Sequence, residues 1–460
     1  MTRLIVALYL CGAAVCPKAS VYASVLQSTS STFQHPQRLV DDVGGSGIDL
    51  LRSTFPNSGI IASSITLDEA IQLALEHYPP LQADRLEVLS AQAGIRQARL
   101  VPNPDLSIEM DQIGRGPKSA FNADEKFWGV SQQIEIGGKR TRRIALAKDG
   151  KNAAESELAA ITLTVVQDVS TRFYDLLAKQ RRLELSDSLL STAEQFYATV
   201  SQRQQAGKVS EVEARRARIL LSGAQVQHQE ARRMVNSAQI ALQSMWGEAV
   251  RPIDKAKGSL DQVVSIPPLD WMMSRLDEHP DLRTLRIKGQ EAQSRHALEQ
   301  SKAIPDLELN FGVRRYRDLG SEGITVGVRI ALPFFDRNQG AIARSSMEVA
   351  QSAIWLESAK LQMMSQIRVG YSDVIAAQSE AEFLGESAIA DAMANLEAIV
   401  IGYEDGKYDL LSVLDAQRVL FEISDLHINA LEQFHTRRLH IERLIGVPFS
   451  FFQAEETRND

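Results

Sequence analysis

Four short segments of the chain alternate between apolar and polar residues with a period of two. This alternation predicts β-strands over about 104–113, 126–136, 305–316 and 323–332, each with one apolar and one polar face. Each segment has about 9–11 residues, the length that a tilted strand needs to cross a bilayer. One such strand alone would favour a soluble, half-buried sheet. Four of them, in a chain with the N-terminus described below, favour strands with lipid on one side and water on the other.

Long stretches without helix breakers follow the second and fourth predicted strands. They cover residues 139–206 and 339–405, and at 1.5 Å per residue each predicts a helix roughly 100 Å long. Helices of this length need a coiled-coil partner, and we expect each to fold back on a return helix at Gly207 or Gly406. A seven-residue step supports this pairing at Val169, Leu176, Leu183, Leu190 and Tyr197, and again at Val413, Leu420, His427, Phe434 and Ile441.

The second half of the chain repeats the order of elements in the first. Pro104-Asp105-Leu106 recurs as Pro305-Asp306-Leu307, and Gly207-Lys208 recurs as Gly406-Lys407. The repeat is far longer than a solenoid period, so we interpret it as a duplicated structural unit. Each unit is expected to contain a first helix, two strands and a long helical hairpin. The first helices are predicted over 66–100, where Thr66 and Glu69 resemble a capping box, and over 268–303.

The N-terminus has the order of a secretory signal peptide. Arg3 precedes an apolar run over 4–15 and a small-residue cleavage site that ends at Ala23. Both cysteines, Cys11 and Cys16, lie in this segment, so the mature chain is expected to carry no disulfide and no thiolate metal site. Lipidation at Cys16 stays open. No later stretch reaches the ~18 apolar residues of a transmembrane helix, so a membrane location would rest on the strands.

These features divide the chain into six segments. They are a signal peptide (1–23), a flexible N-terminal arm (24–63), a first structural repeat (64–247, hairpin 139–246), a linker (248–267), a second structural repeat (268–447, hairpin 339–446) and a C-terminal tail (448–460).

The number of strands predicts how the chain assembles. Four strands cannot close a barrel, and an open sheet edge is not tolerated in lipid. We therefore expect the chain to pool its strands with copies of itself. The expected fold class is mainly α with a membrane β-barrel portion, in a homotrimer with a twelve-stranded barrel and a twelve-helix periplasmic tunnel.

Composition and motifs exclude several function classes. The formal net charge of −8 does not fit a nucleic-acid-binding protein, so no nucleic acid is expected as a partner. The sequence lacks a nucleophile elbow, a phosphate loop and a dinucleotide fingerprint, which predicts no enzyme and no cofactor. The basic, glycine-rich stretch 137–140 is interpreted as a strand-to-helix turn. The histidines form no His-Glu-x-x-His motif, so no resident metal site is expected.

Two strand-to-helix junctions carry a family resemblance. Residues 131–140 read Ser-Gln-Gln-Ile-Glu-Ile-Gly-Gly-Lys-Arg, and residues 332–340 read Leu-Pro-Phe-Phe-Asp-Arg-Asn-Gln-Gly. Together with the duplicated plan, they resemble the cobalt–zinc–cadmium resistance (CzcC-like) branch of the TolC-like outer-membrane factors. The resemblance implies a passive outer-membrane duct for heavy-metal cations. Its implied partners are two further copies, a periplasmic membrane-fusion adaptor, an inner-membrane RND transporter and outer-membrane lipid.

The turn of the second hairpin, at Gly406, holds the candidate site. In TolC-like channels the periplasmic end is closed by inward-curling helices with acidic rings and tyrosine contacts. Alignment on Gly406 makes Tyr403 the gate tyrosine and Asp415 an acidic residue of the constriction, where three copies would form a ring that favours cations. Asp405 and Asp409 are further gate candidates, although both also fit ordinary turn and surface acids.

The resemblance is incomplete at the turns. The family's other acidic ring position falls on Ser412, which predicts weaker cation binding there. On the first turn, Glu211 and Glu213 are candidate partners without an assigned role.

Two other functions remain open at this level. The duct could carry drugs or a secreted polypeptide, or the chain could be a periplasmic coiled-coil adaptor or scaffold that is not a channel. Adaptors have one helical hairpin and strands in soluble domains, so the duplicated plan favours the duct. The expected location is the cell outer membrane, with a long periplasmic extension.

Overall fold

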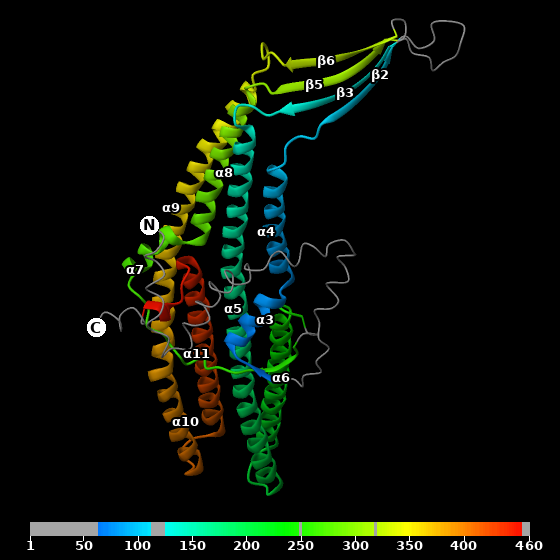
Figure 1. Ribbon diagram of the computed structural model, residues 1–460. Helices are drawn as coiled ribbons and strands as arrows, with labels where there is room; N and C mark the ends of the chain where they lie inside the picture. Colours follow the sequence, from blue (N-terminus) through cyan, green and yellow to red (C-terminus); the bar gives the residue numbers. More distant parts are fainter. Residues whose placement is uncertain (1–62, 112–124, 248–250, 317–319, 453–460) are drawn as a thin grey trace, which may run out of the picture. The chain divides into compact units, whose positions relative to one another are not determined.

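The computed structural model describes residues 63–111, 125–247, 251–316 and 320–452. The predicted signal peptide, the cysteine considered for lipidation and nearly all of the N-terminal arm lie outside these residues, as does the end of the C-terminal tail. In the described part the chain is mainly helical and has short strands (Figure 1).

The described elements follow one another in the order that Figure 1 labels. The helices are α3 (Leu67–His77), α4 (Pro79–Ala98), α5 (Lys139–Gln205), α6 (Glu211–Gln243), α7 (Leu269–Ser274), α8 (Pro280–Lys302), α9 (Gln339–Phe383), α10 (Ile389–Glu404) and α11 (Leu410–Ile445), with a 3-10 turn at Leu276–Glu278 and a π turn at Leu384–Ala388. The strands are β1 (Ser63–Ile65), β2 (Asp105–Asp111), β3 (Glu125–Ile134), β4 (Ile253–Ala256), β5 (Leu307–Tyr316) and β6 (Ser321–Ile330).

The first helix of each half is broken, and the prediction of one continuous helix was wrong in both. Tyr78 takes an extended backbone (φ −66°, ψ 114°) between α3 and α4, and His279 does the same (φ −61°, ψ 134°) before α8. Each of them precedes a proline, whose ring disfavours the helical conformation of the preceding residue. The capping box at Thr66 and Glu69 is confirmed, because each side chain accepts a hydrogen bond from the other residue's backbone amide.

The chain forms two compact units, and each takes segments from both halves of the sequence. The first unit contains the described residues of Met1–Pro79, Thr162–Leu276 and Met363–Asp460. The second contains those of Pro80–Ile161 and Asp277–Gln362. Helices α5 and α9 contribute residues to both units.

A four-stranded antiparallel sheet lies in the second unit, in the order β2-β3-β5-β6 (Figure 1). These strands occupy the four segments predicted from the alternation, with ends that differ by up to two residues. The β3–β5 pairing joins the two halves of the chain along ten residue pairs, from Glu125↔Tyr316 to Ile134↔Leu307.

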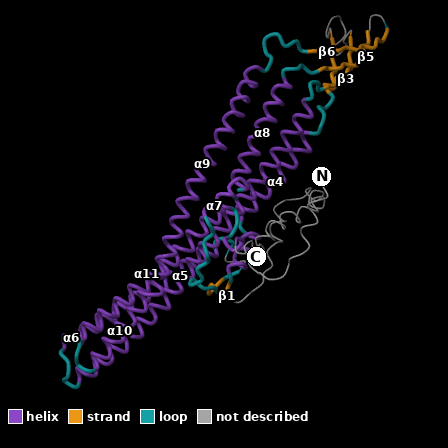
Figure 2. The backbone as a smooth tube through the Cα atoms, turned by 90° about the vertical axis from the view of Figure 1, so that its left-hand side faces the viewer, coloured by secondary structure: helices purple, strands orange, loops and turns teal. Residues whose placement is uncertain are grey.

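Two helical hairpins dominate the first unit. The chain reverses between α5 and α6 at Gly207 (φ 71°) and between α10 and α11 at Gly406 (φ 77°), in the left-handed conformation that glycine adopts without steric cost. Figure 2 shows α10 and α11 side by side up to their turn. The seven-residue positions on α5 and α11 are buried or half-buried, and buried alanines recur on α6 at Ala217, Ala224, Ala231 and Ala238.

Candidate functional site

One face of the four-stranded sheet is apolar and exposed. The register places Ile108, Trp128, Val313 and Ile324 in one row across the strands. The next row contains Leu106, Val130, Phe311 and Val326. Every side chain in both rows is at least 40% exposed, so no described part of the chain covers this face. An apolar face of this kind needs a partner other than water.

The opposite face of the sheet is polar and carries an excess of negative charge. Among the described residues of the four strands, five carboxylates and two guanidinium groups alternate with the apolar rows: Asp105, Glu109, Asp111, Glu125, Glu308, Arg314 and Arg329. The arginines bind neighbouring carboxylates, with Arg314 donating to Glu125 at 3.0 Å and Arg329 to Glu308 at 3.2 Å. The sheet therefore has two different faces: the apolar face suits contact with lipid, and the charged face suits contact with water.

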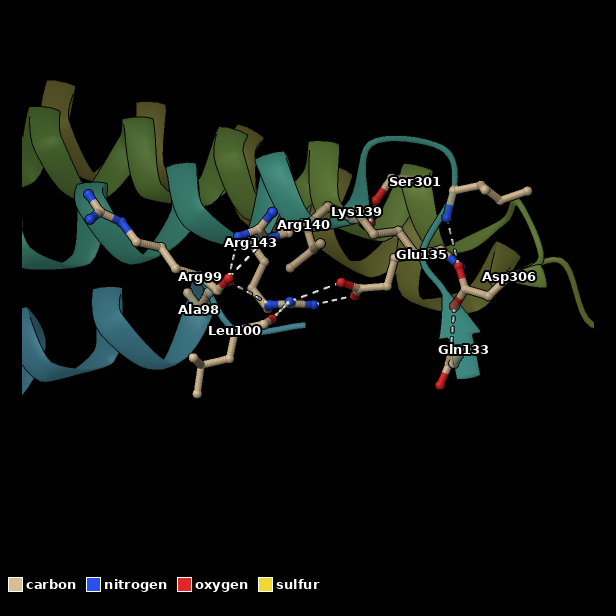
Figure 3. Close-up of polar contacts among 12 residues, drawn as sticks. Ala98, Arg99, Leu100, Gln133, Glu135, Lys139, Arg140, Arg143, Ser301 and Asp306 are labelled. Atoms are coloured by element: carbon tan, nitrogen blue, oxygen red, sulfur yellow. Dashed lines mark hydrogen bonds and ion pairs between the residues drawn. The ribbon is translucent and has the colours of Figure 1, made fainter. Parts of the chain in front are cut away.

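The first strand-to-helix junction is built around Asp306 (Figure 3). Its carboxylate accepts hydrogen bonds from Lys139 Nζ at 2.7 Å, from the backbone amide of Ile136 at 3.1 Å and from Gln133 Nε2 at 2.9 Å. Burial opposes ionisation of Asp306, but these bonds outweigh it, and the pKa of the carboxyl is lowered. The charged pair with Lys139 thus joins the start of α5 to the residue before β5.

Two arginines of the same junction cap the end of α4. Arg143 donates to the carbonyl oxygens of Ala98 at 3.1 Å and Leu100 at 3.0 Å, and its other contacts are with the carboxylate of Glu135. Arg140 donates to the carbonyl of Arg99. The last carbonyl groups of a helix have no partner within the helix, so these side chains explain why the turn is basic (Figure 3).

The second junction uses a similar arrangement with different residues. Asn338 takes a positive φ of 60°, where Gly137 and Gly138 stand in the first junction with φ of 71° and 74°. The Asn338 side-chain amide donates to the carbonyl of Glu299, near the end of α8, at 2.8 Å. In both junctions a left-handed residue turns the chain, and a side chain then holds the end of the preceding helix.

The four predicted gate residues have separate environments in one chain. Asp409 caps α11, because its carboxylate accepts hydrogen bonds from the backbone amide (2.9 Å) and hydroxyl (2.7 Å) of Ser412. The hydroxyl bond and then the amide bond lower the pKa of Asp409. Asp405 ends α10 and pairs with Lys407 at 3.0 Å.

Asp415 is exposed and pairs with a cation on its own helix. Its carboxylate lies 2.8 Å from Arg418, and Arg418 also contacts Glu422 at 2.8 Å. Of the candidates on the first turn, Glu211 pairs with Arg215 one helical turn along, and the backbone amide of Glu213 donates to Ser210.

Tyr403 connects the two hairpins. Its hydroxyl accepts a hydrogen bond from Arg203 at 3.0 Å, and the guanidinium carbon lies 5.4 Å from the centre of the tyrosine ring. Arg203 lies in the last turn of α5, and sequence reasoning did not identify it. A basic residue four positions before Gly207 was the available indication, but its partner lies 200 residues away.

Among the described residues, no three or more His, Cys, Asp or Glu side chains gather in a way that could hold a metal ion. None of the described helices combines the length and apolar character that crossing a membrane requires.

Comparison with known proteins decides the family. The family model of outer membrane efflux proteins matches the chain twice, over residues 70–248 and 271–447. The chain belongs to the outer membrane efflux protein family. It is 28% identical to the cobalt-zinc-cadmium resistance protein CzcC of Cupriavidus metallidurans, over 84% of this chain and 91% of that protein. It is 24% identical to the nickel-cobalt-cadmium resistance protein NccC of Alcaligenes xylosoxydans xylosoxydans, over 68% and 70%.

Solved structures of outer-membrane channels share the fold. CusC matches with a TM-score of 0.70 at 17% identity, over 86% of this chain and 96% of CusC. The MtrE channel of Neisseria gonorrhoeae matches with a TM-score of 0.69 at 18% identity, over 86% and 95%. The predicted family and the mainly helical, TolC-like fold class are confirmed. This outer membrane efflux protein is therefore a channel component of the outer membrane with a periplasmic helical extension, and it is not an enzyme.

Proposed function

We propose that this outer membrane efflux protein is the exit duct of a tripartite heavy-metal efflux system. In this proposal three copies conduct cations of the cobalt, zinc and cadmium class passively, from an inner-membrane RND transporter and a periplasmic adaptor to the exterior. The observation that carries the proposal is the two-faced sheet, whose exposed apolar face suits lipid and whose acidic face suits a water-filled path for cations.

The open edges of the sheet support assembly from several copies. Strands β2 and β6 each pair on one side only among the described residues. Backbone groups in a bilayer need hydrogen-bond partners, so β6 of one copy is expected to pair with β2 of the next. Exposed apolar residues at seven-residue spacing also suit helix pairing between copies, on α6 (Val212, Ile219, Val226) and on α9 (Met347, Ile354, Leu361).

The cation preference rests on charge and on the relatives. The described strands of each copy contribute five carboxylates and two guanidinium groups to the polar face, and three copies multiply this excess around one path. Rings of carboxylates attract cations and disfavour anions in channels. The two metal-resistance relatives named above are consistent with divalent metals as the cargo.

We further propose that the hairpin turns gate the duct. The contact between Tyr403 and Arg203 holds the end of α10 against the end of α5, and Asp415 of three copies forms an acidic ring. Arg418 offsets part of the charge of Asp415, and Ser412 serves as the capping partner of Asp409. The tyrosine contact is therefore the stronger element of the proposed gate.

Conductance across planar bilayers tests both parts of the proposal. A salt gradient across the reconstituted protein should give a reversal potential of the sign expected for cation selectivity, and an anion-selective potential would contradict the proposed cargo. Tyr403→Phe removes the hydroxyl but keeps the ring, and Arg203→Ala removes both contacts. We expect the open fraction to rise in the order wild type, Tyr403→Phe, Arg203→Ala. Equal open fractions would contradict the proposed gate and leave the duct intact.

A further inference from the structure

The turn that follows β6 exposes an unusual pair of aromatic side chains. Phe335 is 94% exposed and Phe334 is 69% exposed, and Leu332 just before them is 68% exposed. No described element of the chain covers them. Exposing this much apolar surface to water is unfavourable, at roughly 25 cal/mol per Å², so the turn is expected to have a partner outside the chain.

Exposed apolar residues continue from β6 into the turn. Alternate residues of β6 from Ile324 to Ile330 lie on the apolar face and are 50–85% exposed, and Leu332 and Phe334 beyond the strand are also apolar and exposed. Exposed apolar surface therefore extends beyond the last residue of the strand, into the turn.

The opposite end of the apolar face has a charged boundary. Lys126, Arg315 and Glu322 occupy one row there, together with Met110. Six residue steps from Ile324 to Ile330, at ~3.4 Å each, give about 20 Å along the strand. A strand tilt of about 40° reduces this to about 16 Å of height, whereas the apolar band of an outer-membrane protein is about 25 Å tall. The apolar part of β6 is therefore shorter than this band.

We infer that residues 332–335 anchor each copy in the periplasmic leaflet of the outer membrane, with Phe334 and Phe335 in the interfacial layer of the lipid. The turn lengthens the apolar band along the membrane normal beyond the end of β6. Aromatic rings are favoured in the interfacial layer of the membrane. Asp336 and Arg337 follow at once, so the chain returns to charged residues at the water side. This inference rests on the proposed function, because it takes the apolar face of the sheet as the lipid side.

The two junctions then have different tasks. The first junction holds the helix to the sheet through the bonds of Asp306 and Arg143, and its exposed apolar residue is the smaller Ile136, at 39%. The second junction holds α8 through Asn338 and presents the two phenylalanines outward. These different tasks explain why only the second of two otherwise similar turns carries a pair of phenylalanines.

Single-cysteine labelling tests the anchor. The chain has cysteines only at Cys11 and Cys16, so the unsubstituted protein serves as the blank. Phe335→Cys, Val326→Cys on the apolar face and Asp336→Cys would each carry a nitroxide in the full chain, reconstituted in phospholipid vesicles. Collisions of the nitroxide with oxygen report lipid, and collisions with a water-soluble nickel chelate report water.

The anchor predicts that a label at position 335 has a several-fold higher oxygen-to-nickel collision ratio than a label at position 336. Equal ratios at these two positions, or a label at 335 shielded from both reagents by a neighbouring copy, would overturn the anchor alone. A water-exposed label at Val326 would overturn the lipid side of the sheet, and with it the proposed function.

Phe335→Trp provides a second measurement without a label. Its added fluorescence, relative to the unsubstituted protein, should be quenched most strongly by lipids brominated near the headgroup. Quenching that does not differ between brominated and ordinary lipids would contradict the anchor.

Discussion

Acidification should destabilise the first compact unit through one buried histidine. His435 on α11 is 1% exposed, and its ring stacks on Tyr174 of α5, with centroids 4.0 Å apart and planes at 7°. Its Nε2 lies 2.7 Å from the carbonyl oxygen of Leu260, so Nε2 carries the hydrogen and donates it. The other nitrogen, Nδ1, is buried and has no hydrogen-bond partner among the described residues. Protonation would place a charge and an unsatisfied donor at this nitrogen.

The size of the effect follows from the pKa of His435. Burial, and then the positive charge of Arg438, lower this pKa from 6.5 to about 4. Because the folded state disfavours the charged form, the contribution of His435 to stability is complete above pH 6.5. It is lost as the pH falls toward 4, with little further change below. At 1.36 kcal/mol per pKa unit, the total loss is about 3 kcal/mol per chain.

A second titrating group requires a matched control. Glu442 is buried, and burial raises its pKa despite the charge of Arg438 and the amide of Phe449. Its protonation stabilises the folded state as the pH falls, with a sign opposite to that of His435. His435→Gln keeps a neutral polar side chain and removes the titration. The difference between wild type and this variant therefore isolates the histidine.

Urea unfolding in detergent, followed by tryptophan fluorescence, gives the required free energies at pH 7 and pH 4. Between these pH values the wild type should lose about 3 kcal/mol more unfolding free energy than His435→Gln. Equal losses in the two proteins would refute the assignment of the pH dependence to His435.

Two further predictions concern a close contact between side chains and an ion pair. A Cβ on Gly385, in the π turn, would lie 2.8 Å from His427 Nε2, whereas a Cβ on Gly150 meets nothing within 4 Å. Gly385→Ala should therefore cost about 1–3 kcal/mol of unfolding free energy, and Gly150→Ala should cost none. Adding His427→Ala should remove most of the extra cost, and an unchanged cost would contradict the steric cause. Arg143→Met should cost about 1–3 kcal/mol, because it strands the half-buried carboxylate of Glu135 and removes the bonds to the end of α4. Partly restored stability in Arg143→Met/Glu135→Met is the check, since the bonds to the end of α4 stay lost, and no cost for Arg143→Met alone would contradict it.

Much of the fold could be predicted because its patterns are local. The period of two in β2, β3, β5 and β6 reflects a sheet with two different faces. Neighbouring residues of a strand point to opposite faces, so the difference is visible in the local sequence. The breaks before Pro79 and Pro280 were missed because the apolar pattern continues across them, although the prolines themselves indicated the breaks. The division into two repeats stays a prediction about the sequence, since each compact unit mixes both halves.

The contacts of the candidate site were harder to predict, because the residues that form them lie far apart in the sequence. The strand-to-helix turn predicted over 137–140 lies at 137–138, and Lys139 is the first residue of α5; its bond to Asp306 depends on how β3 and β5 pair. The contact of Arg203 with Tyr403 likewise depends on how the hairpins pack. Ser412 is different: interpreted as a departure from an acidic ring, it is the capping partner of a residue three positions away. That role was open to prediction.

Growth of a strain that lacks this protein tests the central claim most directly. The strain, with and without the complementing gene, would be exposed to zinc, cobalt, cadmium, nickel, copper, silver and several drugs. The proposed function predicts sensitivity to divalent metals of the zinc, cobalt and cadmium class, restored by the gene, with unchanged growth on the drugs. Sensitivity to the drugs with full metal resistance would contradict the metal cargo.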